Sequence, residues 1–500
     1  MSTLRDDLQS YSDSGIYPFH MPGHKRICKP VPELPYETDV TEVEGTDDLH
    51  HADGILKDAM DRAAALWGAD RSFFLVGGST CGNLAGITAM VPYGSEVICQ
   101  RNAHLSVFHA IELWGLKAHW LQPEEVTLPD GTLLCGSVDP KKVKELLDKH
   151  PEVKGVILTS PTYEGVISDV KTITQICHER ENPIPLLVDE AHGAHLGLFG
   201  EKTKTGEAYG FPKGSVAAGA DLVIQSLHKT LPSLTQTAIL HLQGRLVEAD
   251  AVEEKLSVFE TSSPSYPLME SIDGCVDWLV KEGKKAFETW AENIFAFREA
   301  AKDLTKLSIF AGDAHEQGVF AYDPGKMYIT CGKSSVNGVE LGRCLRERFH
   351  LETEMATANA VLAMTSPADP KEAYDRLSIA LHIIDSELET KAESGSEMNP
   401  ATRSFPANTD ASTAVDTVDT AITIAEAMRG PKEEISLQDP ALEGRTIAEY
   451  LFCYPPGIPL LVPGEVVPAG FADRIKTLEE QGHMEIRRKR QDGILCRKQY

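Results

Sequence analysis

The feature that most constrains the fold is a regular alternation of short apolar runs and helical patterns between residues 55 and 245. The runs are continuously apolar, as expected of strands that helices cover on both faces. The alternation therefore predicts an α/β fold with a mainly parallel central sheet. The expected helices cover 55–68, 83–91, 103–115, 139–150 and 170–179, and the expected strands cover 71–76, 96–100, 118–122, 153–160, 184–190 and 221–225.

The composition excludes some classes of function. There are 48 Lys and Arg against 75 Asp and Glu, and the resulting formal net charge of −27 argues against a nucleic-acid partner. No apolar run approaches the roughly 18 residues that a membrane span needs. The ten cysteines are scattered without a C-x-x-C pair. This spacing fits neither a zinc site nor a disulfide scaffold, and it predicts a reducing, cytoplasmic location.

The histidines do not predict a metal site. His192 and His195 lie close together in the sequence, as do His20 and His24. Neither pair is accompanied by a further cluster of ligands, and a Pro-Gly step breaks the helix that would align the second pair. We therefore expect no metal ion.

Three of the predicted strands end in residues suited to chemistry, at the sheet edge where such folds bind ligands. After 71–76, the stretch 77-GGSTCGN-83 offers Ser79, Thr80 and the free N–H groups of a helix start, which together form a phosphate cradle. Asp189 ends the strand 184–190, and Lys229 follows 221–225 in 226-SLHKT-230. Each alone has an ordinary structural reading: a tight turn, a surface acid, or a lysine that reaches solvent.

Taken together, the three features match the needs of one cofactor. Pyridoxal 5′-phosphate (PLP) requires a lysine to form a Schiff base, an acid that keeps its pyridine nitrogen protonated, and an anion cradle. An acid and a lysine so close to the core are otherwise costly to bury. The combination predicts a PLP site built on Lys229 and Asp189.

The sequence resembles the PLP-dependent ornithine/lysine/arginine decarboxylases of the aspartate-aminotransferase fold (fold type I), in their short form, which lacks the N-terminal wing of the long forms. Two runs are highly specific to this family, 226-SLHKTLPSLTQTAILH-241 and 454-YPPGIPLLVPGE-465. The other matching stretches are 18-PFHMPGHK-25, 40-VTEVEGTDDLHHADG-54, 77-GGSTCGN-83, 101-RNAHLSVFHA-110, 160-SPTYEGV-166 and 188-VDEAHG-193.

The resemblance implies a role for each candidate residue. Lys229 forms the Schiff base, Asp189 pairs with the pyridine nitrogen, His104 stacks on one ring face, and Ala191 lies under the other. The residues expected around the phosphate are Gly78, Ser79, Thr80, Ser226 and His228. Thr162 and His192 are expected near the ring hydroxyl or the substrate carboxylate. The catalytic set is thus Lys229, His104, Asp189 and His192. Two departures from the family are Gly77, where Asn is frequent, and Leu105, where Lys is frequent.

The implied reaction is decarboxylation of a basic amino acid to a polyamine or diamine and CO₂. Arginine is slightly favoured over lysine, and ornithine is less favoured. An aminotransferase, another fold type I lyase and a non-catalytic relic are the alternatives. An aminotransferase needs an arginine for the substrate carboxylate in its C-terminal domain, and Arg343, Arg346 and Arg348 lie there outside any recognisable motif.

The resemblance also implies a homodimer or higher homo-oligomer with active sites at subunit interfaces. A basic substrate needs an acid for its distal charge, and the candidates are Asp47, Asp48, Glu354 and Glu465, each of which also fits an ordinary structural acid. We expect an N-terminal arm (1–50), a large PLP-binding domain (51–290), a small α+β domain (291–392), a linker or loop (393–420) and a C-terminal segment (421–500). The last segment carries the proline-rich run and a basic tail.

Overall fold

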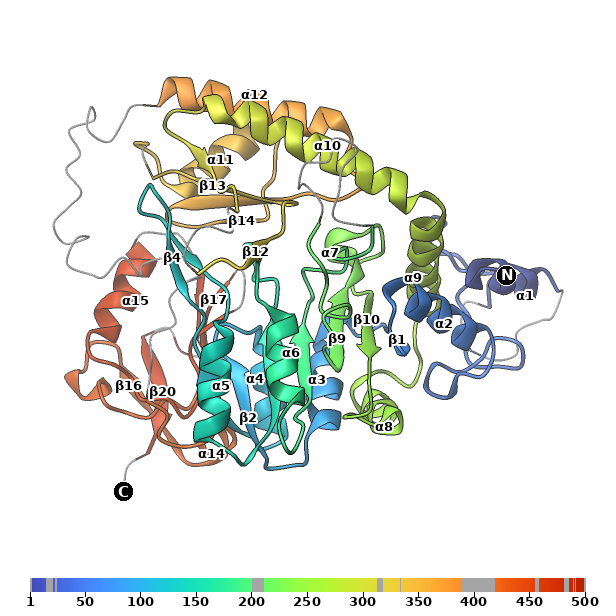
Figure 1. Ribbon diagram of the computed structural model, residues 1–500, viewed down its shortest axis with the longest axis horizontal. Helices are drawn as coiled ribbons and strands as arrows, with labels where there is room; N and C mark the ends of the chain where they lie inside the picture. Colours follow the sequence, from blue (N-terminus) through green and yellow to red (C-terminus); the bar gives the residue numbers. More distant parts are fainter. Residues whose placement is uncertain are drawn as a thin grey trace. The chain divides into compact units, whose positions relative to one another are not determined.

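The helices and strands of the chain are drawn in Figure 1 from a computed structural model. The residues that it describes are 2–14, 21–22, 25–199, 211–312, 318–332, 334–388, 419–454, 458–480, 485–488, 490 and 492–498. His20, His24 and most of the expected linker 393–420 lie outside the described residues. The chain divides into two compact units, which we describe one at a time.

The first unit contains residues 1–92, 155–157 and 170–289. Its strands are β1 (Arg71–Leu75), β8 (Leu186–Asp189), β9 (Leu222–Ser226) and β10 (Ala238–Leu242). Its helices are α1 (Leu4–Asp13), η1 (Leu49–His51), α2 (Ile55–Trp67), α3 (Gly78–Met90), α6 (Val170–His178), α7 (Leu227–Thr230), α8 (Ala249–Phe259), α9 (Tyr266–Trp278), the π-helical segment η2 (Leu279–Gly283) and the start of α10 (Lys284–Ala300).

The helices of this unit begin and end where local chemistry requires. Gly68 ends α2 with φ of 76°, a left-handed conformation that glycine adopts without strain. α3 begins at Gly78, five residues before the helix start expected at residue 83. The glycines and hydroxyl residues of 77-GGST-80 look like a loop, but they form the N-cap and the first turn of this helix.

The largest sheet has seven strands in the order β1-β10-β9-β8-β6-β2-β3. β8 and β9 are parallel, as are β2 (Glu96–Gln100) and β3 (Lys117–Leu121), while β10 is antiparallel to both of its neighbours. The sheet is therefore mixed, because β9 returns through a short connection into β10 rather than through a crossover helix. In the first unit, α3 packs against β1, β8, β9 and β10.

The second unit contains residues 93–154, 158–169 and 290–500. Its strands, beyond β2 and β3, are β4 (Glu125–Thr127), β5 (Leu133–Cys135), most of β6 (Val153–Thr159), β7 (Val166–Ile167), β11 (Ser308–Ile309), β12 (Ala321–Tyr322), β13 (Lys326–Thr330), β14 (Met355–Ala356), β15 (Ala360–Met364), β16 (Lys432–Ser436), β17 (Leu451–Tyr454), β18 (Pro459–Leu461), β19 (Glu485–Arg487) and β20 (Gly493–Arg497). Its helices, beyond the remainder of α10, are α4 (Leu105–Leu113), α5 (Pro140–Lys149), η3 (Ala301–Asp303), α11 (Gly338–Phe349), α12 (Lys371–Glu387), α14 (Ile424–Arg429), η4 (Pro440–Leu442) and α15 (Phe471–Glu480).

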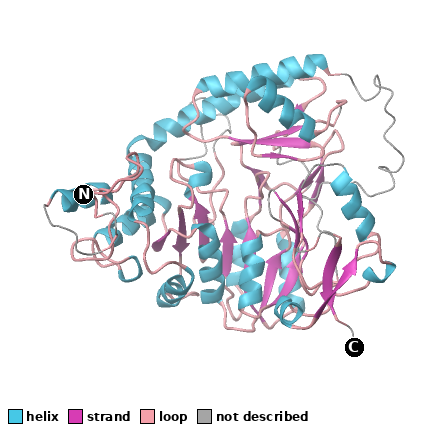
Figure 2. Ribbon diagram, turned by 180° about the vertical axis from the view of Figure 1, so that it is seen from behind, coloured by secondary structure: helices cyan, strands magenta, loops and turns pink. Residues whose placement is uncertain are grey.

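Small antiparallel sheets organise this second unit, and Figure 2 sets its strands apart from its helices by colour. The sheet β11-β13-β15-β14 carries α11 on β14 and β15, and α11 in turn contacts α12. A separate apolar core joins β16, β17, β18, β20 and α15 in the C-terminal region, with Ile447, Leu451 and Ile494 fully buried. Asp139 caps α5 by accepting from the backbone N–H of Lys141 at 2.9 Å, and Pro140 occupies the first turn of this helix.

The fold class expected from the sequence is confirmed: an α/β protein with a seven-stranded central sheet. Most of the predicted strands agree with the structure to within one or two residues. In the described residues, no helix is both long and apolar enough to cross a membrane.

Candidate active site

The candidate aspartate and lysine lie at the edge of the sheet where two neighbouring strands end, Asp189 as the last residue of β8 and Lys229 on the turn that follows β9. β8 and β9 are parallel, and Asp189 lies opposite Ile224. Asp189 and Ser226 are the last residues of these strands, so both lie at the carboxyl-terminal edge of the sheet. β9 continues into α7, a single turn that carries Lys229. Every residue of both strands is buried, which explains the continuously apolar runs of the sequence.

Lys229 is half-buried, and its ammonium group faces a histidine. Its Nζ lies 3.1 Å from Nε2 of His192, three residues beyond Asp189. His192 is 9% exposed. A neutral imidazole at this distance can accept a proton from the lysine, and an unprotonated lysine is a nucleophile toward carbonyl groups.

Asp189 is held by two hydrogen bonds within the first unit. Its Oδ2 accepts from the side-chain amide of Asn83 at 2.9 Å, and its Oδ1 accepts from the backbone N–H of Ala191 at 3.1 Å. Asp189, Asn83 and Ala191 are all buried. A carboxylate offers about four lone-pair sites, so Asp189 can still accept a hydrogen bond from a ligand. Asn83 ends the 77-GGSTCGN-83 motif, but the motif alone does not indicate that it contacts Asp189.

The expected phosphate cradle is the first turn of α3. Gly77, its N-cap, makes no side-chain capping hydrogen bond, so backbone N–H groups of Gly78, Ser79 and Thr80 start the helix without a capping side chain. Gly78 has φ of 72°, a conformation that favours glycine. At Gly77 an added Cβ would lie 2.9 Å from Sγ of Cys81, so a larger residue here requires Cys81 to shift.

Glu260 fixes the strand that leads into this turn. Its Oε1 accepts from the backbone N–H of Val76 at 2.5 Å and of Gly77 at 3.1 Å. Burial raises the pKa of Glu260, and the two N–H groups oppose that shift. The sequence gives no signal for this residue, because 183 positions separate it from Gly77.

Ser226 has the environment expected of a group that binds a ligand. Its hydroxyl is fully buried and, among the described residues, has no hydrogen-bond partner. An unpaired buried hydroxyl is costly and rare in a folded protein. His228, two residues on, donates a hydrogen bond from Nδ1 to the carbonyl of Thr237 at 2.9 Å. Burial lowers the pKa of His228.

A chain of buried polar side chains runs across the strands next to Asp189. Oε1 of Glu190 accepts from Gln225 Nε2 at 2.7 Å, and Gln225 Oε1 lies 3.1 Å from Nε2 of His241. Nδ1 of His241 lies 2.7 Å from the hydroxyl of Ser72. The other carboxylate oxygen of Glu190 accepts from the backbone N–H of Ser215 at 2.7 Å and also from its hydroxyl. We call Ser72, His241, Gln225, Glu190 and Ser215 the polar relay.

The protonation of the polar relay follows from burial. Burial lowers the pKa of His241 to about 3, so its ring is neutral and one nitrogen donates while the other accepts. Because the amide N–H of Gln225 donates to Glu190, its oxygen accepts from His241 Nε2, and Ser72 donates to Nδ1. Ser72 therefore donates to His241, His241 to Gln225, and Gln225 to Glu190, so that Glu190 is the final acceptor of the series. Burial also raises the pKa of Glu190, to about 7.

His104 and Thr162 belong to the second unit. His104 is the exposed N-cap of α4, and its Nδ1 accepts from the backbone N–H of Ser106 at 3.2 Å. Thr162 is buried, and its hydroxyl accepts from the backbone N–H of Val166 at 3.1 Å.

The acids proposed to bind the distal charge of the substrate differ in how many hydrogen bonds they already accept within the protein. Asp47 accepts from the backbone N–H groups of Asp48, Asp53, Gly54 and Leu56, which lower its pKa against the opposing effect of burial. Asp48 caps η1. Glu354 is exposed, and it accepts from the hydroxyl of Tyr163 at 2.5 Å.

Glu465 is engaged inside the second unit. Its two oxygens accept from Nε and Nη2 of Arg101, each at 2.9 Å, and both side chains are almost fully buried. Arg101 also donates to the carbonyls of Pro459 and Leu460. Two motifs of the sequence, 101-RNAH-104 and 454-YPPGIPLLVPGE-465, are therefore joined by an ion pair, and Glu465 is a structural acid.

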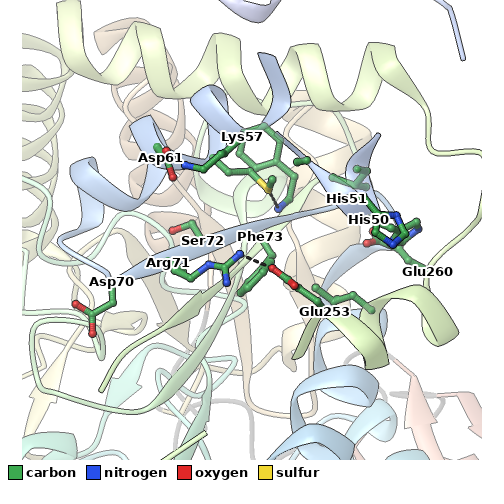
Figure 3. Close-up of a pocket in the computed structure, with 15 residues that line it drawn as sticks. His50, His51, Lys57, Asp61, Asp70, Arg71, Ser72, Phe73, Glu253 and Glu260 are labelled. Carbon is green, nitrogen blue, oxygen red and sulfur yellow. Dashed lines mark hydrogen bonds and ion pairs between the residues drawn. The ribbon is translucent and has the colours of Figure 1, made fainter. Parts of the chain in front are cut away.

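A pocket of about 550 Å³ opens in the first unit beside β1 (Figure 3). Its wall includes His50, Lys57, Glu260 and an ion pair between Arg71 and Glu253. Asp189 and Lys229 are not among its lining residues. The pocket is therefore distinct from the strand-end site, although Glu260 contributes to both.

Comparison with known proteins decides the family. The profile "Orn/Lys/Arg decarboxylase, major domain" matches residues 3–373, and the profile "Orn/Lys/Arg decarboxylase, C-terminal domain" matches residues 408–484. The chain belongs to the Orn/Lys/Arg decarboxylase family. It is accordingly an amino-acid decarboxylase, a carboxy-lyase, as the sequence motifs indicated.

Relatives named arginine decarboxylase match along nearly the whole chain, whereas one named ornithine decarboxylase matches a shorter part. Arginine decarboxylase of Bacillus subtilis is 31% identical over 475 residues, which cover 93% of this chain and 91% of the relative. Arginine decarboxylase of Bacillus anthracis is 29% identical over 95% of this chain and 92% of the relative. The inducible ornithine decarboxylase of a Lactobacillus strain is 25% identical over 60% of this chain and 44% of the relative.

A solved structure shows the same fold at low sequence identity. The lysine decarboxylase of Francisella novicida superposes with a TM-score of 0.80 at 18% identity, covering 99% of this chain and 80% of that protein. The architecture is that of the fold type I PLP-dependent enzymes.

Proposed function

We propose that this decarboxylase uses PLP bound at Lys229 and that its substrate is arginine. The relatives named arginine decarboxylase match more than nine-tenths of the chain, whereas the ornithine relative matches 60% of it. Lysine and ornithine are the less favoured substrates. The products are the corresponding amine and CO₂.

The residues at the strand ends fit this cofactor. The observation that carries the proposal is the position of two residues at the ends of adjacent parallel strands. Asp189 ends β8, and Lys229 lies on the turn that follows β9. The buried hydroxyl of Ser226 lacks a partner in the described structure, and the start of α3 has no capping side chain, so both suit a phosphate. Gly78, Ser79, Thr80 and His228 complete the proposed phosphate site.

When bound, PLP supplies an electron sink for the bond to the departing carboxylate. Asp189 keeps a proton on the ring nitrogen by offering it a negative charge. Asn83 and the Ala191 N–H fix the direction of that carboxylate. Without a fixed acid at this position the ring nitrogen would lose its positive charge more readily, and the reaction would slow.

Lys229 and His192 handle protons at the reacting carbon. Lys229 must lose a proton to act as a nucleophile, and Nε2 of His192 at 3.1 Å is placed to receive it. The same pair can return a proton to the substrate carbon after CO₂ leaves. We also propose that His192 and Thr162 lie near the ring hydroxyl of PLP or the carboxylate of the substrate.

His104 is assigned to stack on the face of the ring opposite Ala191. The contacts of its Nδ1 with Ser106 hold the ring in one orientation relative to α4, as stacking requires. We propose a homodimer or larger homo-oligomer in the cytoplasm, in which Glu354 or Asp48 meets the distal charge of the substrate, from the same or a neighbouring subunit. Asp47 and Glu465 are less suited, because backbone amides and Arg101 already occupy them.

The decisive experiment compares Lys229→Ala with Lys281→Ala, an exposed lysine that pairs with Asp277. Purified proteins are incubated with PLP and freed of unbound PLP by gel filtration, their visible absorbance is recorded, and CO₂ release is measured with arginine, lysine and ornithine. We expect a visible band and CO₂ release in the wild type and the control, and neither in Lys229→Ala. A band without CO₂ from any of the three would point to another reaction on this fold. A band that persists in Lys229→Ala would remove the central residue of the proposal.

A further inference from the structure

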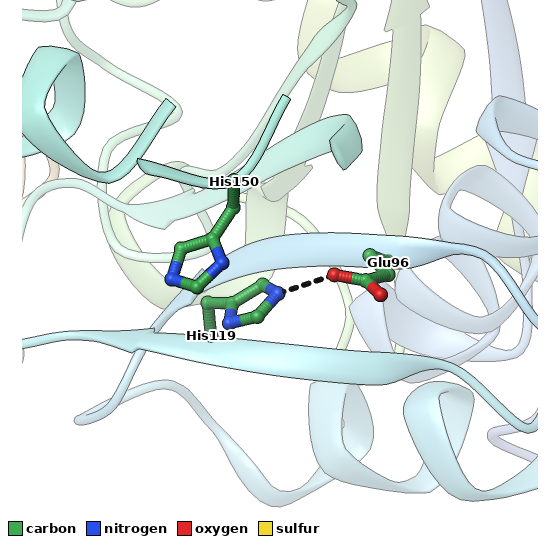
Figure 4. A group of neighbouring side chains, drawn as sticks. All are labelled: Glu96, His119 and His150. Carbon is green, nitrogen blue, oxygen red and sulfur yellow. Dashed lines mark hydrogen bonds and ion pairs between the residues drawn. The ribbon is translucent and has the colours of Figure 1, made fainter. Parts of the chain in front are cut away.

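Three side chains with metal-binding groups converge at the far edge of the large sheet, in the second unit (Figure 4). Glu96 is the first residue of β2, and His119 lies in the middle of the neighbouring strand β3. His150 follows the last turn of α5, which packs against both strands. The three residues span 55 positions of sequence, so no local motif announces them.

One ligand atom from each side chain lies within 4.8 Å of the other two. His119 Nε2 is 2.7 Å from Oε2 of Glu96, and the rings of His119 and His150 stack with centroids 3.7 Å apart and planes 19° from parallel. The side chains of Glu96 and His119 are 23% and 13% exposed. The cluster is therefore sheltered enough to be ordered and open enough for an ion to reach it.

The chemical types of the three ligands indicate which metal ions the cluster would bind. Two imidazoles and one carboxylate are the ligands preferred by Zn²⁺, Co²⁺, Ni²⁺ and Cu²⁺, whereas Mg²⁺ and Ca²⁺ prefer oxygen atoms throughout. With bonds of roughly 2.1 Å, ligand atoms on one tetrahedral ion lie about 3.4 Å apart. The ligand atoms lie within 4.8 Å of one another, so binding one ion requires the two stacked rings to turn until their nitrogens converge.

Lys117 competes with a cation but does not block it. Its Nζ bonds Oε1 of Glu96 at 2.8 Å, whereas Oε2 is the oxygen that faces His119. A carboxylate can hold a lysine on one oxygen and a metal ion on the other. The side chain of Lys117 is 56% exposed and is free to turn toward solvent.

We propose that Glu96, His119 and His150 bind one divalent transition-metal ion, of which Zn²⁺ is the representative, with water in the remaining position. The ion ties the end of α5 to the start of β2 and the middle of β3. Within the second unit it lies near the N-terminal end of β2, whereas His104 follows the carboxyl end of that strand. The site is therefore structural and separate from decarboxylation.

The test measures metal binding directly. The holoenzyme is treated with a chelator, and its Cys28 is replaced by serine because that thiol is exposed. Zn²⁺ binding is measured by calorimetry, and Co²⁺ binding by its visible absorption. We expect about one ion per chain, with affinity weakened about a hundredfold or more in His119→Ala and His150→Ala, since even outer-shell changes cost 10- to 100-fold. His382→Ala, on α12 in the same unit, is the matched control and should bind as the wild type does.

Two further variants keep the result interpretable if a histidine variant folds poorly. Glu96→Gln preserves the shape and should still weaken binding, and Lys117→Ala should strengthen it several-fold by removing a competing cation. A cluster held only by hydrogen bonds predicts no gain from Lys117→Ala. The proposal is overturned if the wild type takes up no ion, or if the cluster variants bind Zn²⁺ as tightly as His382→Ala does. Decarboxylation should be unchanged in all of these variants.

Discussion

The side-chain amide of Asn83 donates a hydrogen bond to Oδ2 of Asp189 at 2.9 Å, in the buried interior of the first unit. Asn83 lies in the second turn of α3, the helix whose first turn carries Ser79 and Thr80. One helix therefore both presents the proposed phosphate cradle and orients the acid proposed to meet the ring nitrogen. In the proposed site, a single helix would therefore position both ends of the cofactor.

Replacing Asn83 with alanine should weaken cofactor binding and slow decarboxylation. A hydrogen bond to a charged group contributes about 1.5–3 kcal/mol, which corresponds to roughly 10- to 100-fold in PLP affinity if the whole effect reaches the bound state. PLP titration followed by absorbance measures the loss. Thr88→Ala, on the same helix, removes a buried hydroxyl that bonds only the carbonyl of Leu84 and its neighbour, and should leave PLP affinity unchanged. Equal effects of the two variants would contradict the assigned role.

Ser226→Ala should act in opposite directions on the free and the cofactor-bound protein. The buried hydroxyl of Ser226 has no partner among the described residues, so removing it relieves a cost of about 1–3 kcal/mol, and the cofactor-free variant should be more stable to urea than the wild type. PLP should bind about tenfold more weakly, because a phosphate contact is lost. Ser137→Ala is the matched control, since its hydroxyl is satisfied by Ile167 and Phe320. That variant should lose stability and keep its PLP affinity. A Ser226→Ala protein less stable than the wild type without PLP would contradict the prediction.

The raised pKa of Glu190 predicts a particular dependence of stability on pH. Its pKa is about 7 in the folded chain and 4.5 as a reference, so between these values the folded state holds a proton that the unfolded state has released. The contribution of Glu190 to the free energy of unfolding is therefore greatest below pH 4.5, falls between pH 4.5 and 7, and is constant above. The total change is on the order of 3 kcal/mol.

Glu190→Gln isolates this contribution, because glutamine has no proton to release. Urea unfolding of both proteins from pH 4.5 to 8 should show the variant gaining stability relative to the wild type as the pH rises to 7. A difference that stays constant across this range would show that Glu190 is ionised throughout. Selective ¹⁵N labelling of histidine should independently report His241 as a neutral ring protonated on Nε2, since the polar relay fixes that tautomer.

Breaking the ion pair between Arg101 and Glu465 should be strongly destabilising. Glu465→Gln leaves the guanidinium of Arg101 buried without its counter-charge, which costs about 3–5 kcal/mol. Replacing both residues with apolar ones of similar volume should recover much of the loss. Thermal unfolding measures both effects, and Arg348→Ala, from an exposed pair with Glu387, should change little. If Glu465→Gln lowers the stability of the protein only slightly, water must reach the guanidinium of Arg101, which would contradict its burial.

Much of the fold could be predicted because its signals are local. The strand 96–100 and the cap of α5 follow from apolar runs and from Asp139 and Pro140, whose effects act within a few residues. The start of α3 was missed because its first turn consists of residues that usually form loops. The antiparallel direction of β10 was missed because pairing direction is set by the connection, not by the strand's own residues.

The candidate site shows the same division. Lys229, Asp189 and Ser226 could be named because each directly follows or ends a buried strand. Asn83 and Glu260 act on this site from 106 and 183 or more positions away in sequence, and nothing local marks them. Glu96, His119 and His150 were not anticipated, and no metal was expected, because only the packing of α5 on β2 and β3 brings them together.

The ion pair between Arg101 and Glu465 also limits which parts of two related proteins can be joined in a chimaera. The two residues are 364 positions apart and fall in the parts of the chain matched by different family profiles, the major and the C-terminal domain. A chimaera that joins the major domain of one relative to the C-terminal domain of another must keep both partners, or it buries a lone charge. In this chain the regions matched by the two profiles are therefore coupled by a buried ion pair.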